Sequence, residues 1–157
     1  MTLEEAEFAQ RTEALQPRLY RTALLYLGGE APAAEAVAET VYRGFLNRKK
    51  LRHPEFFSTW MTRILMNVCC DELRRRKRET AWEDLPEPAA EDYDPLPLRT
   101  AVERLPDEVR AVIVLRYFTG LTLAETAESL GIPPGTVSTR QRKGLALLRL
   151  DLEEEGF

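Results

Sequence analysis

The sequence predicts an all-α protein built from two small helical domains that are joined by an acidic, proline-rich linker. Apolar residues recur at helical spacing along most of the chain, and no segment keeps the strict alternation of a strand. The segment 80–98 lacks this periodicity and carries four of the ten prolines, six acidic residues and no basic residue. Such a composition favours an extended linker over a packed helix. The expected divisions are an N-terminal domain 1–79, a linker 80–98, a C-terminal domain 99–152 and an acidic tail 153–157.

The charge of the chain is distributed unevenly. The formal net charge is −4, which is unusual for a protein that binds nucleic acid. Residues 1–79, however, carry 14 basic and 11 acidic side chains, and residues 99–150 carry 8 basic and 5 acidic ones. Two mildly basic domains therefore flank the acidic linker, and this pattern is compatible with nucleic-acid binding.

Three helices are expected in the N-terminal domain. The first ends at Gly28, the second begins at Pro32, and the third runs from near Pro54 to about Arg78. The expected buried positions of the third helix are Phe57, Trp60, Ile64 and Val68.

The third helix ends in five consecutive cations. Arg74, Arg75, Arg76, Lys77 and Arg78 exceed what a helix C-terminus needs to offset its dipole, so we expect part of the run to bind phosphate. Aromatic residues near its start, Trp60 among them, suit single-stranded DNA, whose bases stack on aromatic rings. Packing in the core is the competing interpretation for Trp60.

A helix-turn-helix is expected between residues 121 and 149. Thr122 and Glu125 form a capping box that begins one helix, Gly131 suits its C-terminus, and Pro134 suits the first turn of the next helix. A preceding helix is expected from Pro106, with Val109, Val112, Ile113 and Tyr117 on its apolar face. The last helix places Val137, Gln141, Gly144, Leu145 and Leu148 on one side and Thr139, Arg142, Lys143 and Ala146 on the other. An apolar back and a polar, basic front suit a helix that enters the major groove.

The sequence predicts neither catalysis nor a cofactor. Cys69 and Cys70 are adjacent in a helical segment and are expected to be small buried residues, and His53 is the single histidine, so no metal site is expected. The chain has no glycine-rich phosphate loop and no nucleophile paired with His53. Its acidic start lacks a signal-peptide core and its apolar runs are short, so we expect a cytoplasmic protein without membrane insertion.

Taken together, these motifs resemble those of the extracytoplasmic-function (ECF) group of bacterial RNA polymerase sigma factors. The signature of region two in that family is similar to Trp60, Arg63, Asn67, Asp71 and the arginine run of this chain. The signature of region four is similar to residues 105–150. The resemblance implies a promoter-specificity subunit that is not an enzyme, binds the clamp and flap of core RNA polymerase and promoter DNA, and is inhibited by an anti-sigma factor.

The resemblance also implies roles for individual residues. Region two captures the melted minus-ten strand and flips a base into a pocket. The corresponding residues here are Leu51, Arg52, His53, Trp60, Arg63, Asn67, Arg74 and Arg75. Region four reads the minus-thirty-five element as duplex: Ser138, Thr139 and Arg142 would reach base edges, whereas Arg140 and Lys143 would contact phosphate.

The helix expected to bind polymerase departs from the family pattern. Two acidic residues and a glutamine of the family motif are missing, whereas Glu35 and Glu39 remain one helical turn apart. Polymerase binding is therefore expected to rely more on Val41, Tyr42 and Phe45. This departure keeps two alternatives open, a stand-alone helix-turn-helix regulator and a sigma-like decoy of polymerase.

Overall fold

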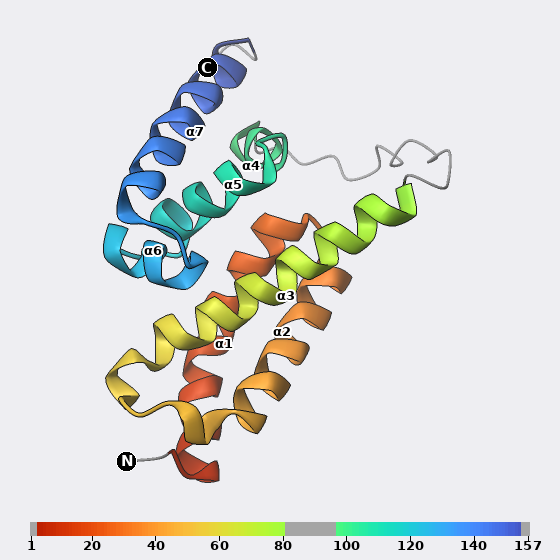
Figure 1. Ribbon diagram of the computed structural model, residues 1–157. Helices are drawn as coiled ribbons and strands as arrows, with labels where there is room; N and C mark the ends of the chain where they lie inside the picture. Colours follow the sequence, from red (N-terminus) through yellow and green to blue (C-terminus); the bar gives the residue numbers. More distant parts are fainter. Residues whose placement is uncertain (1–2, 81–96, 155–157) are drawn as a thin grey trace.

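The computed structural model describes residues 3–80 and 97–154, and its regular elements in these ranges are all helical. The N-terminal half contains α1 (Glu5–Leu27), α2 (Glu30–Leu46) and α3 (Phe57–Thr80), with the short helices η1 (Arg48–Lys50) and η2 (Pro54–Phe56) between α2 and α3. The C-terminal half contains α4 (Pro97–Glu103), α5 (Asp107–Ile113), η3 (Val114–Phe118), α6 (Leu123–Leu130) and α7 (Pro134–Glu154). The predicted all-α class is confirmed (Figure 1). Most of the predicted linker, and the end of the predicted tail, lie outside the described residues.

The glycine and capping signals read from the sequence produce the expected helix ends, whereas α2 begins at Glu30, two residues before the predicted start at Pro32. Gly28 closes α1 with φ 76°, and Gly131 closes α6 with φ 66°, a left-handed conformation that suits glycine. The Thr122 hydroxyl accepts from the Glu125 backbone N–H at 3.1 Å, and the Glu125 carboxylate accepts from the Thr122 backbone N–H at 3.0 Å. The predicted capping box is therefore present at the start of α6.

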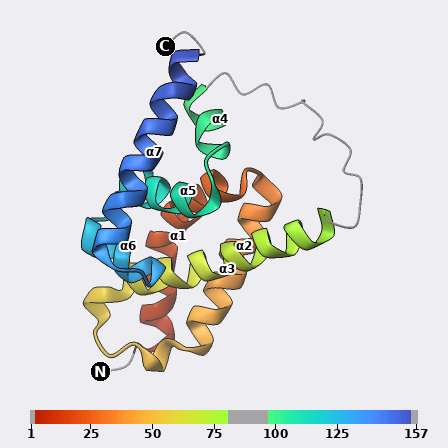
Figure 2. The same ribbon diagram turned by 45° about the horizontal axis from the view of Figure 1, so that its top comes forward.

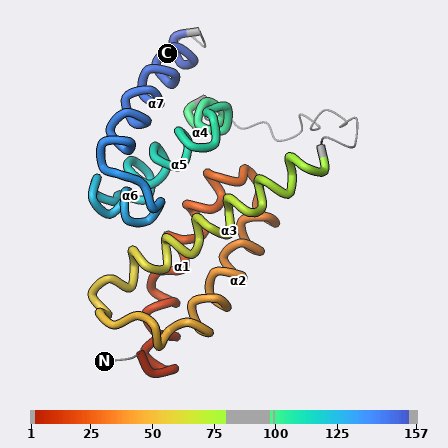
Figure 3. The backbone as a smooth tube through the Cα atoms, viewed as in Figure 1, coloured from red at the N-terminus to blue at the C-terminus, as the bar shows by residue number. Residues whose placement is uncertain are grey.

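The helices of the N-terminal half form a bundle in which α3 lies across α1 and α2 (Figures 1 and 3). The prediction of its buried stripe was right for Phe57 and Val68 but not for the whole stripe. Trp60 and Ile64 are half-buried. The fully buried side chains of α3 instead include Met61, Leu65, Met66 and Cys69. The buried face is wider than one stripe because α3 packs against α1, α2 and α6.

Two expected core positions of the C-terminal half are exposed. Tyr117 is 50 % exposed because residues Val114–Phe118 form a π-helical turn, whose extra residue rotates the following side chains away from the core. Leu145 is 41 % exposed. It lies about 80° around α7 from Val137, at the edge of the stripe that Gly144 and Leu148 continue into the core.

The two halves pack against one another. Ala111, Leu115 and Leu121 of the C-terminal half belong to the same buried cluster as Leu19 and Leu65 of the N-terminal half. In both views α6 lies beside the first half of α3, whereas α7 extends away from the N-terminal bundle (Figures 1 and 2). This packing positions the surfaces described next.

Candidate nucleic-acid interface

A groove of about 570 Å³ lies between the loop that precedes α3 and the first half of that helix. The N-terminal half contributes Lys50, Leu51, Arg52, His53, Phe56, Thr59, Trp60 and Arg63 to its lining, and α6 contributes Ala124, Glu125 and Glu128. The loop is held by η2, in which the Phe56 N–H donates to the His53 carbonyl oxygen at 2.9 Å. Five of the eight residues predicted to bind the minus-ten strand therefore come together in one groove.

The groove combines aromatic surfaces with exposed cations. Trp60 packs against Phe57, with 6.3 Å between ring centroids, and also lines the groove. Phe56 is 57 % exposed, and its ring meets the edge of His53. Arg52 is exposed at the rim. Such a surface can stack a base and pair with the backbone of a single strand. Trp60 thus packs against the core and also lines the groove, and its stacking on DNA stays a prediction.

Other predicted residues of the third helix lie elsewhere. Asn67 is exposed on α3 and does not line the groove, and Arg74 and Arg75 lie near the far end of the helix. Phe56 also lines the groove, but it was not among the residues that the sequence predicts to bind the minus-ten strand. Its aromatic ring close to His53 in the sequence was the available signal. Thr59 and the α6 residues that line the groove were not predicted from the sequence either. The α6 residues carry no local signal, because only tertiary packing brings that helix to α3.

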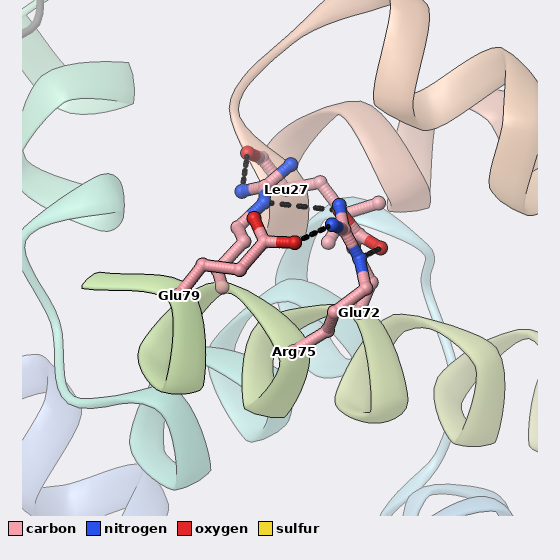
Figure 4. Close-up of polar contacts among 5 residues, drawn as sticks. Leu27, Glu72, Arg75 and Glu79 are labelled. Carbon is pink, nitrogen blue, oxygen red and sulfur yellow. Dashed lines mark hydrogen bonds and ion pairs between the residues drawn. The ribbon is translucent and has the colours of Figure 1, made fainter. Parts of the chain in front are cut away.

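The basic end of α3 is engaged in contacts within the chain (Figure 4). Arg75 pairs with Glu72 at 2.7 Å and with Glu79 at 2.6 Å, and its hydrogen bond lowers the pKa of the Glu72 carboxyl. Arg76 donates to the Leu27 carbonyl oxygen at 2.9 Å, which joins α3 to the C-terminus of α1. Lys77 pairs with Asp107 of α5 at 2.8 Å and Arg74 with Asp71 at 3.2 Å. Arg74, Arg75, Arg76 and Lys77 thus have carboxylate or carbonyl partners among the residues that the structure describes, and the run also joins α3 to α1 and α5. Exposed ion pairs are weak enough to be exchanged for phosphate.

The helix-turn-helix is held together by Arg116. Its Nε donates to the Gln141 side-chain oxygen at 2.9 Å, and another guanidinium nitrogen donates to the Leu121 carbonyl oxygen at 2.7 Å. These bonds join the π-helical turn to α7 and to the segment that leads into α6. The sequence predicts Gln141 on the apolar side of α7. In the structure its side-chain oxygen accepts the hydrogen bond from Arg116.

The front of α7 carries the residues predicted to read duplex DNA. The exposed residues of this face are Thr139, Arg142 and Lys143. Within the described ranges, neither Arg142 nor Lys143 makes an ion pair. Ser138 is half-buried. Arg140 differs from these, because it is 28 % exposed and its guanidinium lies 3.4 Å from the Glu108 carboxylate. The predicted set therefore shares one helix, and Arg142 and Lys143 are its most available cations.

The predicted polymerase-binding residues lie on α2. Glu35 and Glu39 are exposed, and Glu39 pairs with Arg43 at 2.9 Å. Val41, Tyr42 and Phe45 line a groove of about 520 Å³ between α1 and α2. Tyr42 is 59 % exposed, so the α2 face presents both carboxylates and an aromatic ring to a partner.

The described residues contain no group of three or more histidine, cysteine or carboxylate side chains placed to hold a metal ion. Burial raises the pKa of the Cys69 thiol to about 12, which keeps it protonated at neutral pH. Among the described helices, none has the length and apolar character needed to cross a bilayer.

Comparison with known proteins matches both halves of the chain. The family model described as Sigma-70 region 2 matches residues 12–79, and the model described as Sigma-70, region 4 matches residues 101–150. RNA polymerase sigma factor SigV of Bacillus subtilis is 30 % identical over 141 residues, which cover 87 % of this chain and 85 % of the relative. ECF RNA polymerase sigma factor SigL of Mycobacterium tuberculosis is 32 % identical over 155 residues, which cover 88 % and 84 %.

Solved structures share the fold. The sigma factor RpoE of Bartonella quintana, in complex with the anti-sigma factor NepR, aligns with a TM-score of 0.80 at 21 % identity over 93 % of this chain and 96 % of that one. CnrH, in complex with the cytosolic domain of CnrY, aligns with a TM-score of 0.76 at 21 % identity over 98 % and 92 %. With an aromatic, cationic groove on α3 and a polar, basic face on α7 in one chain that matches both family models, the protein belongs to the ECF group of the sigma-70 family, the promoter-specificity subunits of bacterial RNA polymerase.

Proposed function

We propose that this chain binds core RNA polymerase through α2, captures the melted minus-ten strand in the groove beside α3, and reads the minus-thirty-five duplex with α7. The single observation that carries the proposal is that one chain presents both a groove lined by aromatic and cationic side chains and an exposed polar, basic face on α7. The functional units are residues 1–79 and 99–152, which the linker 80–98 joins. The chain acts in the cytoplasm and contributes binding and strand capture, with no bond made or broken by its own side chains.

The groove beside α3 suits a base that has left the duplex. Flipping a base costs a few kcal/mol of stacking, and the receiving surface must offset that cost. Trp60 and Phe56 supply aromatic faces, and Arg52, His53 and Arg63 supply hydrogen-bond donors around them. Asn67 lies outside the groove, so we assign it to an adjacent nucleotide of the same strand.

The front of α7 suits duplex DNA. It combines the exposed Thr139 and the half-buried Ser138 with the exposed cations Arg142 and Lys143. Short polar side chains can read base edges from the major groove, and cations can hold phosphate. We assign Ser138, Thr139 and Arg142 to base edges and Lys143 to phosphate. Arg140 reaches phosphate by exchanging its exposed partner Glu108.

Two protein partners are proposed. Core polymerase occupies the α2 face through Glu35, Glu39 and Tyr42, with Val41 and Phe45 in the adjoining groove. An anti-sigma factor is the second. Of the solved relatives described above, RpoE is in complex with the anti-sigma factor NepR, and CnrH is in complex with the cytosolic domain of CnrY.

Run-off transcription with purified core polymerase and genomic promoter fragments tests the proposal. We expect initiation at a defined start site that depends on this protein and is lost in Arg52→Ala, whereas Arg21→Ala, at another exposed arginine on α1, retains it. Polymerase binding without initiation would favour the decoy. Sequence-specific duplex binding without any polymerase binding would favour the stand-alone regulator.

A further inference from the structure

A polar residue, Gln141, lies on the apolar side of α7. It is between Val137, which is fully buried, and Gly144, where a Cβ would lie 2.5 Å from an Ile113 side-chain carbon. A polar group in such a place needs a hydrogen-bond partner, because leaving it unpaired costs free energy. Gln141 is half-buried, and its side-chain oxygen accepts from the Arg116 Nε at 2.9 Å. The pair is therefore a directional contact within a mainly apolar packing face.

Arg116 uses the same guanidinium to join a further segment of the helix-turn-helix. Another of its nitrogens donates to the Leu121 carbonyl oxygen at 2.7 Å. Leu121 directly precedes Thr122, the N-cap residue of α6, and Arg116 itself belongs to the π-helical turn Val114–Phe118. The fixed fork of an arginine suits two such acceptors at once, whereas a lysine presents a single point charge. One planar group thus links the π-helical turn, the segment that leads into α6, and α7.

The apolar contacts of α7 hold it against its neighbours but constrain its rotation less. In Figure 2, α7 lies beside α5 and α6, and the large side chains that it buries are Val137 and Leu148. Apolar contact is non-directional, so a small rotation of the helix changes its free energy little. A hydrogen bond weakens steeply when its angle departs from linear. The bond between Arg116 and Gln141 is therefore sensitive to the rotation of α7 about its own axis.

This rotation decides where the front residues of α7 point. Arg142 lies about 100° and Thr139 about 160° around the helix from Gln141, so Arg116 meets α7 on the side away from them. Side-chain ends lie roughly 6 Å from a helix axis, and a rotation of about 20° moves them by about 2 Å. Such a displacement breaks a hydrogen bond to a base edge. A phosphate contact of a long, flexible lysine tolerates it better.

We propose that Arg116 is a positioning residue for duplex reading: through Gln141 and the Leu121 carbonyl oxygen it sets the rotation of α7, and with it the sequence preference, without touching DNA. The inference rests on the proposed function of the front of α7. Base-edge contacts depend on the rotation, whereas attraction to the phosphate backbone depends mainly on charge. Loss of the contact between Arg116 and Gln141 therefore reduces discrimination between sequences more than affinity for mixed-sequence DNA.

Three variants isolate this contact. Gln141→Leu removes the acceptor, keeps every charge of the chain and places an apolar residue on the apolar side of α7. Arg116→Leu removes the donor. Arg104→Leu is the matched control, because it removes the same charge and breaks the 3.0 Å contact of Arg104 with Asp151, near the other end of α7. Circular dichroism of the full chain checks that each variant is folded.

Sequence preference is measured on the full chain as a ratio of two affinities. A pool of duplexes of about 30 base pairs, randomised over about ten, is selected with the wild type and sequenced. Fluorescence anisotropy then compares the enriched duplex with the unselected pool. The ratio should fall on the order of tenfold in Gln141→Leu and in Arg116→Leu, and stay within about twofold of the wild type in Arg104→Leu. The double variant should lose no more than either single variant, because both remove the same contact.

Two further measurements separate positioning from other roles. Gln141→Glu keeps an acceptor for Arg116 and should retain the wild-type ratio, since the added charge weakens binding to both duplexes alike. Salt dependence should be equal in the wild type and Arg116→Leu, whereas loss of a direct phosphate contact would reduce it by about one counterion.

Three outcomes would overturn the inference: an unchanged ratio in Gln141→Leu, a ratio in Gln141→Glu as low as in Gln141→Leu, or a salt dependence reduced in Arg116→Leu. Failure of the proposed function of α7 is distinguishable from these, because the wild type itself would then enrich no sequence from the pool.

Discussion

The Arg110 guanidinium of α5 lies over the Tyr26 ring of α1, 4.9 Å from its centroid. Arg110 is 7 % exposed and donates to the Glu103 carbonyl oxygen at 2.8 Å and to the Asp107 carboxylate at 2.9 Å. Tyr26 is 3 % exposed, and burial raises the pKa of its hydroxyl, which stays a hydrogen-bond donor at neutral pH. A buried guanidinium of the C-terminal half therefore lies over an aromatic ring of the N-terminal half.

Replacing this cation should destabilise the chain. Arg110→Met leaves the Glu103 carbonyl oxygen without its buried donor and should lower the free energy of unfolding by about 2–4 kcal/mol. Arg149→Met, at a position whose side chain is 81 % exposed, is the matched control and should change it by less than about 0.5 kcal/mol. Urea denaturation of the full chain measures both, and equal effects would contradict a structural role for Arg110.

Two glycines of α7 should respond in opposite directions to alanine. A Cβ at Gly144 would lie 2.5 Å from an Ile113 side-chain carbon and 2.9 Å from a Val109 carbon, whereas a Cβ at Gly135 would have nothing within 4 Å. Gly144→Ala should therefore cost about 1–3 kcal/mol despite a better helix propensity. Gly135→Ala should stabilise by about 0.4–1 kcal/mol. Thermal unfolding of both variants checks the prediction, and stabilisation by both would show that α7 does not pack this closely on α5.

The capping box should make stability depend on pH. The backbone N–H of Thr122 is the main cause that holds the pKa of Glu125 below its ordinary value of 4.5. A carboxyl with a depressed folded pKa stabilises the protein above its unfolded pKa, and this contribution is lost as pH falls through the folded pKa. Glu125→Gln keeps the hydrogen bond but not the charge. The wild type should thus be the more stable protein at neutral pH, and its advantage should shrink below about pH 4.5. Urea denaturation from neutral pH to below pH 4.5 measures the free energy of unfolding of both proteins. A difference between them that does not change with pH would contradict a stabilising role for the Glu125 charge.

Two cations on the front of α7 should differ in their effect on DNA binding: loss of Arg142 should change sequence preference, and loss of Lys143 should change affinity for all sequences. Arg142→Ala should cost about 1–3 kcal/mol of duplex binding and relax preference at one base pair of the upstream element. Lys143→Ala should weaken binding to all sequences and reduce the salt dependence by about one counterion. Anisotropy against duplexes substituted at each position distinguishes the two, and a uniform loss in Arg142→Ala would make that residue a phosphate contact.

Local sequence signals predicted the ends of α1 and α6. Gly28, Gly131 and the Thr122–Glu125 pair act through backbone conformation and short-range hydrogen bonds, so a few neighbouring residues suffice to predict them. Tyr117 was misplaced because a π-helical turn breaks the helical period from which its burial was inferred.

The sequence by itself determined the all-helical class, the two halves, the exposed front of α7 and the cluster of Arg52, His53 and Trp60 near the start of α3. These features depend on periodicity and on residues close together in the chain. Only the tertiary structure decided that Glu128 would lie beside Arg63, that Thr22 would meet Thr119, and that Arg110 would lie over Tyr26. Such contacts join residues 65 to 97 positions apart. They are set by how the apolar faces of whole helices fit together, which no local pattern contains.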